Sequence, residues 1–437
     1  MKRTVLVSFA LVFTAASARA QGLTMGTTNG WTFTFSGNVN AFLTYTSTSC
    51  KDPGGLSNGC GGILGNLVPT GDAENVTRIR TGLAPGFAIF DAKGKEGNLD
   101  LGVHFGFAPE IQNADRMHDQ GGFVQVGAQI DMREAYLTAG GTWGQILAGR
   151  TVGLYQKENL LTDMTVYGFG LSGGGASGQG TSLGHIGTGY LYPNFNAQMT
   201  YSTPSNRAGV FSVGLFDPSI VTLDAGQVAP PSCGPPCILP VYDVTSMPRL
   251  EAEYVYTKQT GTTGSADKVM FYVSGLIQQA KSTNNSCCVG ATSITPWGLA
   301  GGIEWNAAGW QIDASGSYND GLGTFLMFDD GTAVDFDGKR RTSYSYLAQL
   351  QYTLKNSDWK VGASYGLNHL SQTTFDKANL GSIPDMAEDN SALVASATYM
   401  WTKSLRWVFE YTYGSSSSIY GVKSTSNQGA VGMMLFF

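Results

Sequence analysis

The chain has 437 residues, of which 13% are charged, 11% are aromatic and 59 are glycine. Charged residues thus stand at about half the ~25% of an average soluble protein, and glycine at about twice its usual ~7%. A chain this apolar, with a formal charge of −6, can bury enough surface to fold, which excludes disorder. No Gly-X-Y period runs through it, which excludes collagen. No basic cluster is longer than Lys339-Arg340-Arg341, so no nucleic-acid partner is expected.

The first twenty residues have the pattern of a bacterial signal peptide. Lys2-Arg3 form a short basic region, residues 4–16 are mostly apolar, and Ala18-Arg19-Ala20 fits a small-x-small cleavage site. The apolar stretch is shorter than the ~20 residues of a membrane-spanning helix. We therefore predict export and cleavage before Gln21. Cleavage removes three of the 26 basic residues, and with 32 acidic residues the mature formal charge is −9.

The mature chain alternates apolar and polar residues over long stretches. From Trp31 to Tyr45 the odd positions are largely apolar, and the even positions are polar except Phe42. The same alternation recurs at 99–107, 359–368 and 405–413. A period of two predicts β-strands with one apolar face, and these runs are longer than the five or six residues of an ordinary strand. No later segment has the 18 apolar residues of a membrane helix.

Aromatic residues mark the ends of the apolar faces, as in Trp297…Trp305 and Trp310…Tyr318. In a membrane barrel the outer face meets lipid, and Trp and Tyr prefer its two interfaces. A large soluble β-sandwich or β-helix is the alternative, but its strands are shorter and lack this bias. We therefore predict an all-β, transmembrane β-barrel.

Sixteen antiparallel strands are predicted, an even number as in single-chain bacterial barrels. Long and short connections alternate, as external loops and periplasmic turns do, so both chain ends should be periplasmic. Sixteen strands leave a water-filled lumen, whereas eight would pack solid. Residues 21–437 form this one barrel domain, and its strands are expected at 31–46, 75–91, 98–109, 123–139, 143–152, 186–203, 209–216, 247–258, 266–280, 296–306, 309–319, 342–354, 359–370, 390–402, 405–416 and 427–437.

The last strand carries a further signal. Val431, Met433, Leu435 and Phe437 lie on one face, and the chain ends on an aromatic residue. Outer-membrane barrels commonly end in this way, and their assembly machinery is thought to recognise the strand. The barrel-assembly machinery is therefore an expected partner.

Two neighbouring segments resemble the Gram-negative general porins. These are Ile130 to Leu137, reading IDMREAYL, and Gly140 to Arg150, reading GGTWGQILAGR. The C-terminal strand and the loop order agree with this resemblance. It implies a sixteen-stranded barrel in the outer membrane of a Gram-negative bacterium, surrounded by lipid and lipopolysaccharide. It also implies a homotrimer that passively conducts ions and small hydrophilic solutes.

The resemblance also implies a narrowing of the pore by an inward-folded third long loop, here about 153–185. In general porins, acidic residues of this loop face arginines of the wall. Opposed charges across a narrow gap order water and favour polar solutes. An arginine on the lipid side at mid-depth costs ~2–4 kcal/mol, so wall arginines should point inward. The candidate constriction residues are Arg78, Arg80, Arg133, Arg150, Glu158 and Asp163.

Two features leave the selectivity open. The second half of the loop, 168–184, is rich in Gly and Ser and carries no charge, unlike the family pattern. The mature charge favours cations, whereas dominant wall arginines would favour anions, because the constriction sets selectivity.

All six cysteines lie in predicted outer loops, and an exported chain can form disulfides. Six cysteines allow 15 pairings. The local pairs Cys50–Cys60 and Cys233–Cys237 are the simplest, and Cys287-Cys288 could bridge to each other or to other loops. Zinc at 233–237 would lack a second ligand pair, so no metal is expected.

The sequence supports functions other than a general pore less well. Some outer-membrane barrels are enzymes, but the four histidines show no convincing nucleophile–base pairing, and none is expected here. A channel selective for sugars, organic acids or amino acids remains the main alternative. Inward aromatics such as Phe42 and Tyr272 are sparse, which favours a general pore. A receptor role of the outer loops is compatible with either. No cofactor motif is present: Gly173-Gly174-Gly175 lacks the context of a dinucleotide site.

Overall fold

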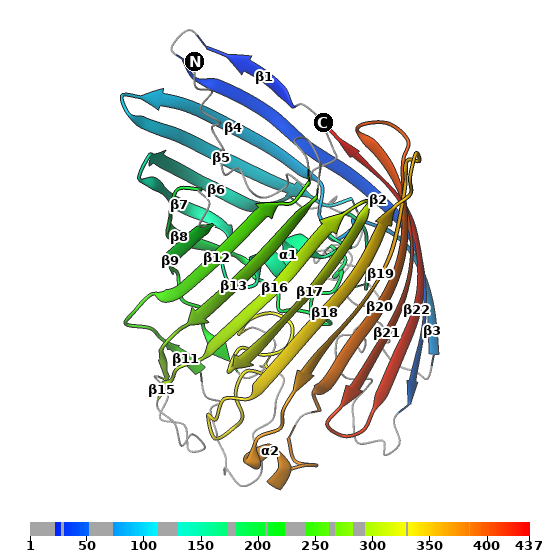
Figure 1. The fold of residues 1–437 in the computed structure, drawn as a ribbon. Helices are drawn as coiled ribbons and strands as arrows, with labels where there is room; N and C mark the ends of the chain where they lie inside the picture. The colour runs from blue at the N-terminus through cyan, green and yellow to red at the C-terminus, as the bar shows by residue number, and fades with distance from the viewer. Residues whose placement is uncertain are drawn as a thin grey trace, which may run out of the picture.

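An antiparallel sheet runs along the chain and closes on itself (Figure 1). The computed structural model describes residues 22–27, 30–51, 73–111, 130–172, 181–205, 209–222, 241–261, 267–282, 293–328, 331–383 and 385–437. The wall strands are β2 (Thr32–Lys51), β3 (Ala73–Arg80), β4 (Phe87–Glu96), β5 (Leu99–Pro109), β6 (Ile130–Gly141), β7 (Gly144–Val152), β8 (Phe195–Ser202), β9 (Val210–Phe216), β12 (Arg249–Gln259), β13 (Lys268–Ile277), β16 (Trp297–Ala307), β17 (Trp310–Asp320), β18 (Thr342–Thr353), β19 (Trp359–Leu370), β20 (Ala387–Met400), β21 (Leu405–Ser418) and β22 (Lys423–Phe436).

The closed ring has sixteen strands. The sheet contains 18 assigned strands, but β1 (Leu23–Gly26) only flanks the start of β2, and β3 and β4 pair with successive parts of β2 as one wall strand. The last strand, β22, pairs with β2 from Asn38 to Lys51 and closes the ring. The predicted all-β sixteen-stranded barrel is confirmed. None of the helices in the described residues is long and apolar enough to cross a bilayer.

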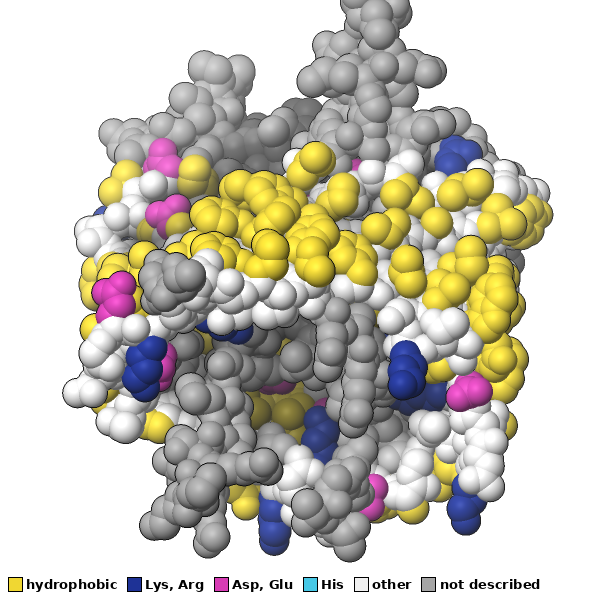
Figure 2. Space-filling model, turned by 90° about the horizontal axis from the view of Figure 1, so that it is seen from above, with side chains coloured by type: hydrophobic (Ala, Val, Ile, Leu, Met, Phe, Trp, Pro, Cys, Tyr) yellow, Lys and Arg dark blue, Asp and Glu magenta, His cyan; other side chains and the backbone are white. Residues whose placement is uncertain are grey.

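The barrel exposes apolar side chains on its outside and buries polar side chains inside, which is the reverse of a soluble protein. On β2, Leu43 and Tyr45 are 55% and 53% exposed, whereas Thr44 between them is 2% exposed. The outer face is therefore apolar and the inner face polar, as lipid outside and a polar interior require. Charged side chains are visible in the central hollow when the molecule is viewed from the end that carries the termini (Figure 2).

The second predicted strand, 75–91, is interrupted at 81–86. There the chain leaves the ladder, and the side chain of Asn40 replaces it: Oδ1 accepts from Gly82 N and Nδ2 donates to Ala84 O, both at 2.8 Å. The freed backbone of Leu83 and Ala84 donates to carbonyls of residues 168 and 166. One predicted strand is thus two, because a loop competes for its hydrogen bonds.

Other predicted strand boundaries need correction. The strand expected from residue 186 begins at Phe195, so the connection between β7 and β8, called the third loop below, spans 153–194 and contains α1 (Lys157–Thr162). The strand expected from residue 427 begins at Lys423. The strand expected at 123–139 is observed from Ile130, and 112–129 lie outside the described residues.

The described connections at the end opposite the termini form a packed cap that was not predicted (Figure 1). Four short strands make a second sheet, β10 (Val221–Thr222), β11 (Val241–Val244), β14 (Ala280–Ser282) and β15 (Ser293–Ile294). Helix α2 (Thr374–Ala378) lies in the same region. One buried apolar cluster joins this sheet to the connections around Phe328, Phe336 and Ile383, and to Tyr155 and Leu191 of the third loop. We call these connections, without the third loop, the cap.

Candidate functional site

The third loop hydrogen-bonds to the polar inner face of strands far apart around the ring. Gln156 N donates to Ser274 Oγ of β13 at 3.1 Å, and Met164 N donates to Gln349 Oε1 of β18 at 2.6 Å. Later in the loop, Thr412 Oγ1 of β21 donates to the carbonyl of residue 170 at 3.0 Å. Because β13 and β21 lie on different sides of the barrel, the loop crosses its interior (Figure 1).

Two glutamates of the wall hold the crossing at its ends. Glu251 Oε2 on β12 accepts from Leu154 N and Tyr155 N at 2.8 and 2.9 Å. Glu410 Oε2 on β21 accepts from Phe169 N and Gly170 N at 2.8 and 2.7 Å. A Cβ on Gly168 would lie 2.1 Å from Glu410 Oε1, so a glycine is needed for this approach. Charge-assisted bonds of this kind are about twice as strong as neutral ones.

Asp163, a predicted constriction residue, holds the third loop together. Its Oδ1 accepts from Thr165 N at 2.8 Å, and its Oδ2 accepts from Tyr190 Oη at 2.7 Å and His185 N at 3.1 Å. The side chain is buried, with the residue 1% exposed. Its charge is thus directed into the loop, and no wall arginine forms an ion pair with it among the described residues.

Glu158 lies at the start of α1 in a group of charges. The neighbouring Lys157 Nζ lies 3.9 Å from its carboxylate and also pairs with Glu253 on β12. Lys268 of β13 pairs with Glu304 of β16 at 2.9 Å. Glu253 and Glu304 are buried on the inner face of the wall. Lys157 and Lys268 were not among the predicted site residues. Strand parity could have identified Lys268, whereas the contact of Lys157 depends on the path of the loop.

Arg78 and Arg80 lie on the inner face of β3, as predicted. They pair in register with Thr44 and Phe42, which are buried inside, while Ile79 between them is exposed on the outside. The Arg80 guanidinium lies 5.9 Å from the ring centre of Phe169 in the third loop. The Arg78 side chain is exposed. The structure thus brings Arg80 into contact with the third loop, while Arg78 lies two residues earlier on the same inner face.

Arg150 contradicts the prediction that all four arginines face the lumen. It pairs in register with Ala135 and Ala197. Ala197 lies two residues before Met199 on the same strand face, and Met199 is exposed on the outer side of the barrel. It therefore lies on the outer side of β7, close to the strand's end, where an arginine costs only about 0–1 kcal/mol. The prediction failed because the cost of a lipid-facing arginine at mid-depth does not apply to a residue near the end of a strand.

Arg133 occupies a β-bulge in β6, where the register with β5 shifts. Its Nε lies 2.9 Å from Asp131 Oδ2, and its guanidinium lies 5.5 Å from the ring centre of Phe195. The bulge adds a residue to one strand, so simple alternation does not give the direction of this side chain. Arg133 is thus part of a local ion pair at the start of β6.

A further charged group on the inner wall was not predicted. His104 Nδ1 lies 2.9 Å from Asp91 Oδ1, and Nε2 lies 3.0 Å from Glu134 Oε2. Thr151 Oγ1 donates to the other oxygen of Glu134 at 2.8 Å. Since both ring nitrogens face carboxylate oxygens, these contacts fit an imidazolium between two acids. The group links four neighbouring strands, β4 to β7.

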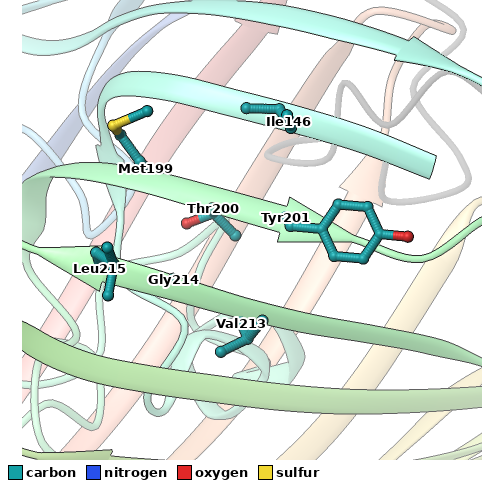
Figure 3. Close-up of a pocket in the computed structure, with 7 residues that line it drawn as sticks. All are labelled: Ile146, Met199, Thr200, Tyr201, Val213, Gly214 and Leu215. Carbon is teal, nitrogen blue, oxygen red and sulfur yellow. The ribbon is translucent and has the colours of Figure 1, made fainter. Parts of the chain in front are cut away.

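A shallow apolar groove lies on the outer surface of β7, β8 and β9 (Figure 3). Its apolar lining residues face the lipid side, so it does not mark a path through the barrel. The lining residues of the groove are Ile146, Met199, Thr200, Tyr201, Val213, Gly214 and Leu215.

No group of three or more metal-binding side chains occurs in the part of the chain that the structure describes.

Cys50 was expected in an outer loop, but the structure places it in β2, which continues past the predicted end at residue 46 to Lys51. Cys50 is disulfide-bonded and packs against Val422. The other candidate cysteines, Cys60, Cys233, Cys237, Cys287 and Cys288, lie outside the described residues.

Comparison with known proteins agrees with this architecture. The model of the Gram-negative porin family matches residues 7–418. No curated protein matches the chain.

Solved structures of outer-membrane proteins share the fold. The outer membrane channel DcaP of Acinetobacter baumannii is 16% identical, with a TM-score of 0.61 over 94% of this chain and 99% of that chain. An anion-selective porin from Comamonas acidovorans is 12% identical, with a TM-score of 0.55 over 93% and 100%. OmpF of Salmonella typhi, in complex with daunomycin, is 14% identical, with a TM-score of 0.52 over 95% and 100%.

Proposed function

The chain belongs to the Gram-negative porins and is an outer-membrane channel, and we propose that it conducts ions and small hydrophilic solutes passively past its third loop. The observation that carries this proposal is the crossing of a polar barrel by a loop held at Glu251 and Glu410. Such a loop narrows a lumen, and in this channel its two ends are fixed by hydrogen bonds to wall carboxylates. The family and fold are those of a channel rather than of an enzyme, and the proposed activity needs no catalytic residue or cofactor.

The proposed narrowing lies between the wall cations Arg78 and Arg80 and the group around Glu158 on α1. Arg80 and Glu158 lie toward different parts of the ring: Arg80 is on β3 next to Phe169, whereas Glu158, in α1 of the third loop, lies beside Lys157, which pairs with Glu253 of β12. Charges of opposite sign across a narrow aqueous gap favour polar solutes. Arg150 and Asp163 are left out of this proposal because one lies outside and the other is used within the loop.

Conductance of the refolded protein in a planar bilayer tests the proposal. Under a salt gradient we expect stepwise currents, and the sign of the reversal potential reports which charges govern the narrowing. A folded barrel without any current contradicts an open pore.

We also propose that the channel assembles as a homotrimer in a lipid and lipopolysaccharide environment. The apolar outer face is suited to lipid or to a neighbouring copy. Currents that close in groups of three, together with a trimer-sized band on an unheated gel, would support this assembly. A monodisperse monomer with full conductance would contradict it.

Residues 1–20 are proposed to be a signal peptide that is removed on export. They lie outside the described residues, and the first described strand, β1, begins at Leu23. The mass of the protein from outer membranes should correspond to a chain beginning at Gln21. A mass that includes Met1 would contradict cleavage.

A further inference from the structure

Arg406 of β21 is held on the inner wall by two aromatic rings. Its guanidinium lies 5.1 Å from the ring centre of Tyr167 in the third loop and 4.7 Å from that of Phe436 in β22. The two rings stand edge to face, with centres 5.5 Å apart. This arrangement fixes the guanidinium plane without supplying a negative charge.

No acidic side chain of the described residues forms an ion pair with Arg406, and its buried Nε has no hydrogen-bond partner. Glu410, four residues along the same strand and on the same face, accepts instead from Phe169 N and Gly170 N. By contrast, Arg249 pairs with Glu251 at 2.8 Å and Lys268 pairs with Glu304 at 2.9 Å. Arg406 therefore presents a positioned, uncompensated charge.

A second cation lies near Arg406 on the same inner face. Lys360 of β19 pairs in register with Thr398, and Arg406 pairs with Met400, two residues further along the intervening strand β20. Lys360 Nζ donates to the neutral amide of Gln311 at 2.9 Å, and the charges of Asp313, Arg406 and Glu304 all act on it. Asp313 and Glu304 partly compensate Lys360, so Arg406 is the cation of the two that lacks an acidic neighbour among the described residues and gains most from a solute anion.

We propose that Arg406, assisted by Lys360, is a subsite for the carboxylate group of small organic anions that pass the third loop at Tyr167. The guanidinium offers a planar set of donors that matches a carboxylate, and the rings of Tyr167 and Phe436 hold it in place. The inference rests on the proposed pore function and names the solute class that this part of the pore favours.

Block of chloride current by benzoate tests the subsite, with benzamide as a neutral probe of the same size. In the wild-type channel, benzoate should reduce the current in a voltage-dependent manner and benzamide should not. Arg406→Gln should weaken the benzoate block about tenfold, which is about 1.4 kcal/mol. Arg406→Lys keeps the charge but loses the planar donors, so an intermediate block is expected. Arg150→Gln is the matched control, because this arginine lies on the outer face.

The outcomes separate the subsite from the pore. Equal block by benzoate and benzamide, or an unchanged benzoate block in Arg406→Gln, overturns the subsite while leaving the channel intact. Equal block of the chloride current by phosphate and by benzoate at matched charge overturns the preference for carboxylates. A folded wild-type barrel that passes no current overturns the pore, and the subsite with it. Heat-modifiable gel mobility shows that each variant is folded, and the comparison of benzoate with benzamide needs no variant.

Discussion

Arg341 and Asp376 form a fully buried ion pair that joins two connections of the cap. Arg341 Nε lies 2.8 Å from Asp376 Oδ2 and Nη2 lies 2.8 Å from Oδ1, and both side chains are 0% exposed. Arg341 directly precedes β18, while Asp376 lies in the first turn of α2, where it also accepts from Thr373 N in a capping box. Phe336 and Phe375 pack beside the pair with ring centres 6.2 Å apart. The pair therefore fixes the cap over one part of the barrel.

Asp376→Asn should release this part of the cap. Removing one partner of a buried ion pair leaves an uncompensated charge and costs about 3–5 kcal/mol. Trypsin cleavage after Lys377 in the folded protein should accelerate by about a hundredfold or more, since each 1.4 kcal/mol is tenfold. The control is Asp320→Asn, because the Arg340–Asp320 pair is more exposed, at 33% and 16%, and such pairs contribute about 0–1 kcal/mol. Equal cleavage of the two variants contradicts the assignment.

The same pair predicts an acid-dependent loosening of the cap. Burial tends to raise the pKa of Asp376, but the hydrogen bonds and charge of Arg341 outweigh it and hold the pKa below the ordinary value of 3.8. A lowered pKa contributes stability above pH 3.8, and this is lost as the pH falls through the folded value. Burial raises the pKa of the neighbouring Asp335, which has the opposite sign and takes up its proton at higher pH.

Pepsin cleavage of the cap should therefore stay slow at pH 4.5 and rise steeply below pH 3.8. Asp376→Asn should remove most of this pH dependence, because its cap is open at both pH values. A wild-type cap that loosens between pH 6 and pH 5 would show that another group controls it.

The clamp at Glu410 predicts a change in the pore. In Glu410→Gln a neutral amide oxygen replaces the charged Oε2 that accepts from both Phe169 N and Gly170 N, and the NH₂ group takes the place of Oε1. Hydrogen bonds to charged groups contribute about 1.5–3 kcal/mol each, so this end of the third loop should detach more often. We expect a larger and noisier single-channel current. Glu304→Gln removes a wall carboxylate that pairs with Lys268, and it should shift selectivity without added noise. Equal noise in both variants contradicts a clamp.

The cysteine that is bonded to Cys50 can be identified by mass spectrometry. Cys50 is bonded and lies where β2 leaves the wall, packed against Val422. The nearest cysteine along the chain is Cys60, and a short loop is the easiest to close. Mass spectrometry of non-reduced peptides should therefore find Cys50 linked to Cys60. A link from Cys50 to Cys233, Cys237, Cys287 or Cys288 would contradict this pairing and show that the disulfide joins different outer loops.

The barrel itself could be predicted from the sequence because each wall strand obeys one local rule. Leu43, Thr44 and Tyr45 show why: a period of two separates lipid-facing from lumen-facing side chains, and β-geometry imposes that period on every strand. The rule failed where another element competes for the backbone. Asn40 hydrogen-bonds to Gly82 and Ala84 and thereby interrupts a strand, and no periodicity in 75–91 signals this.

The candidate site could be predicted only in part, for a related reason. Alternation gave the inward direction of Arg78, but it could not show that Glu410 accepts hydrogen bonds from the third loop, or that Arg406 has no acidic partner among the described residues. Such pairings depend on where a long connection folds in three dimensions. The cap could not be predicted for the same reason. Its apolar cluster consists of single residues from several loops, and these residues share no sequence period.

Arg78 and Arg150 provide a matched test of which arginines govern selectivity. Both were expected in the lumen, but Arg78 shares the inner face with Thr44, and Arg150 shares the outer face with Ala135 and Ala197. A fixed charge beside a narrow pore changes the local ion concentration, whereas one outside the wall is separated from the pore by the barrel. Arg78→Gln should therefore lower the ratio of chloride to potassium permeability by about twofold or more. Arg150→Gln should leave it unchanged. The reversal potential in a tenfold gradient of potassium chloride, on the order of tens of millivolts, measures both variants under the same conditions. If the reversal potential shifts as much in Arg150→Gln as in Arg78→Gln, the assignment of Arg150 to the outer face of β7 is wrong.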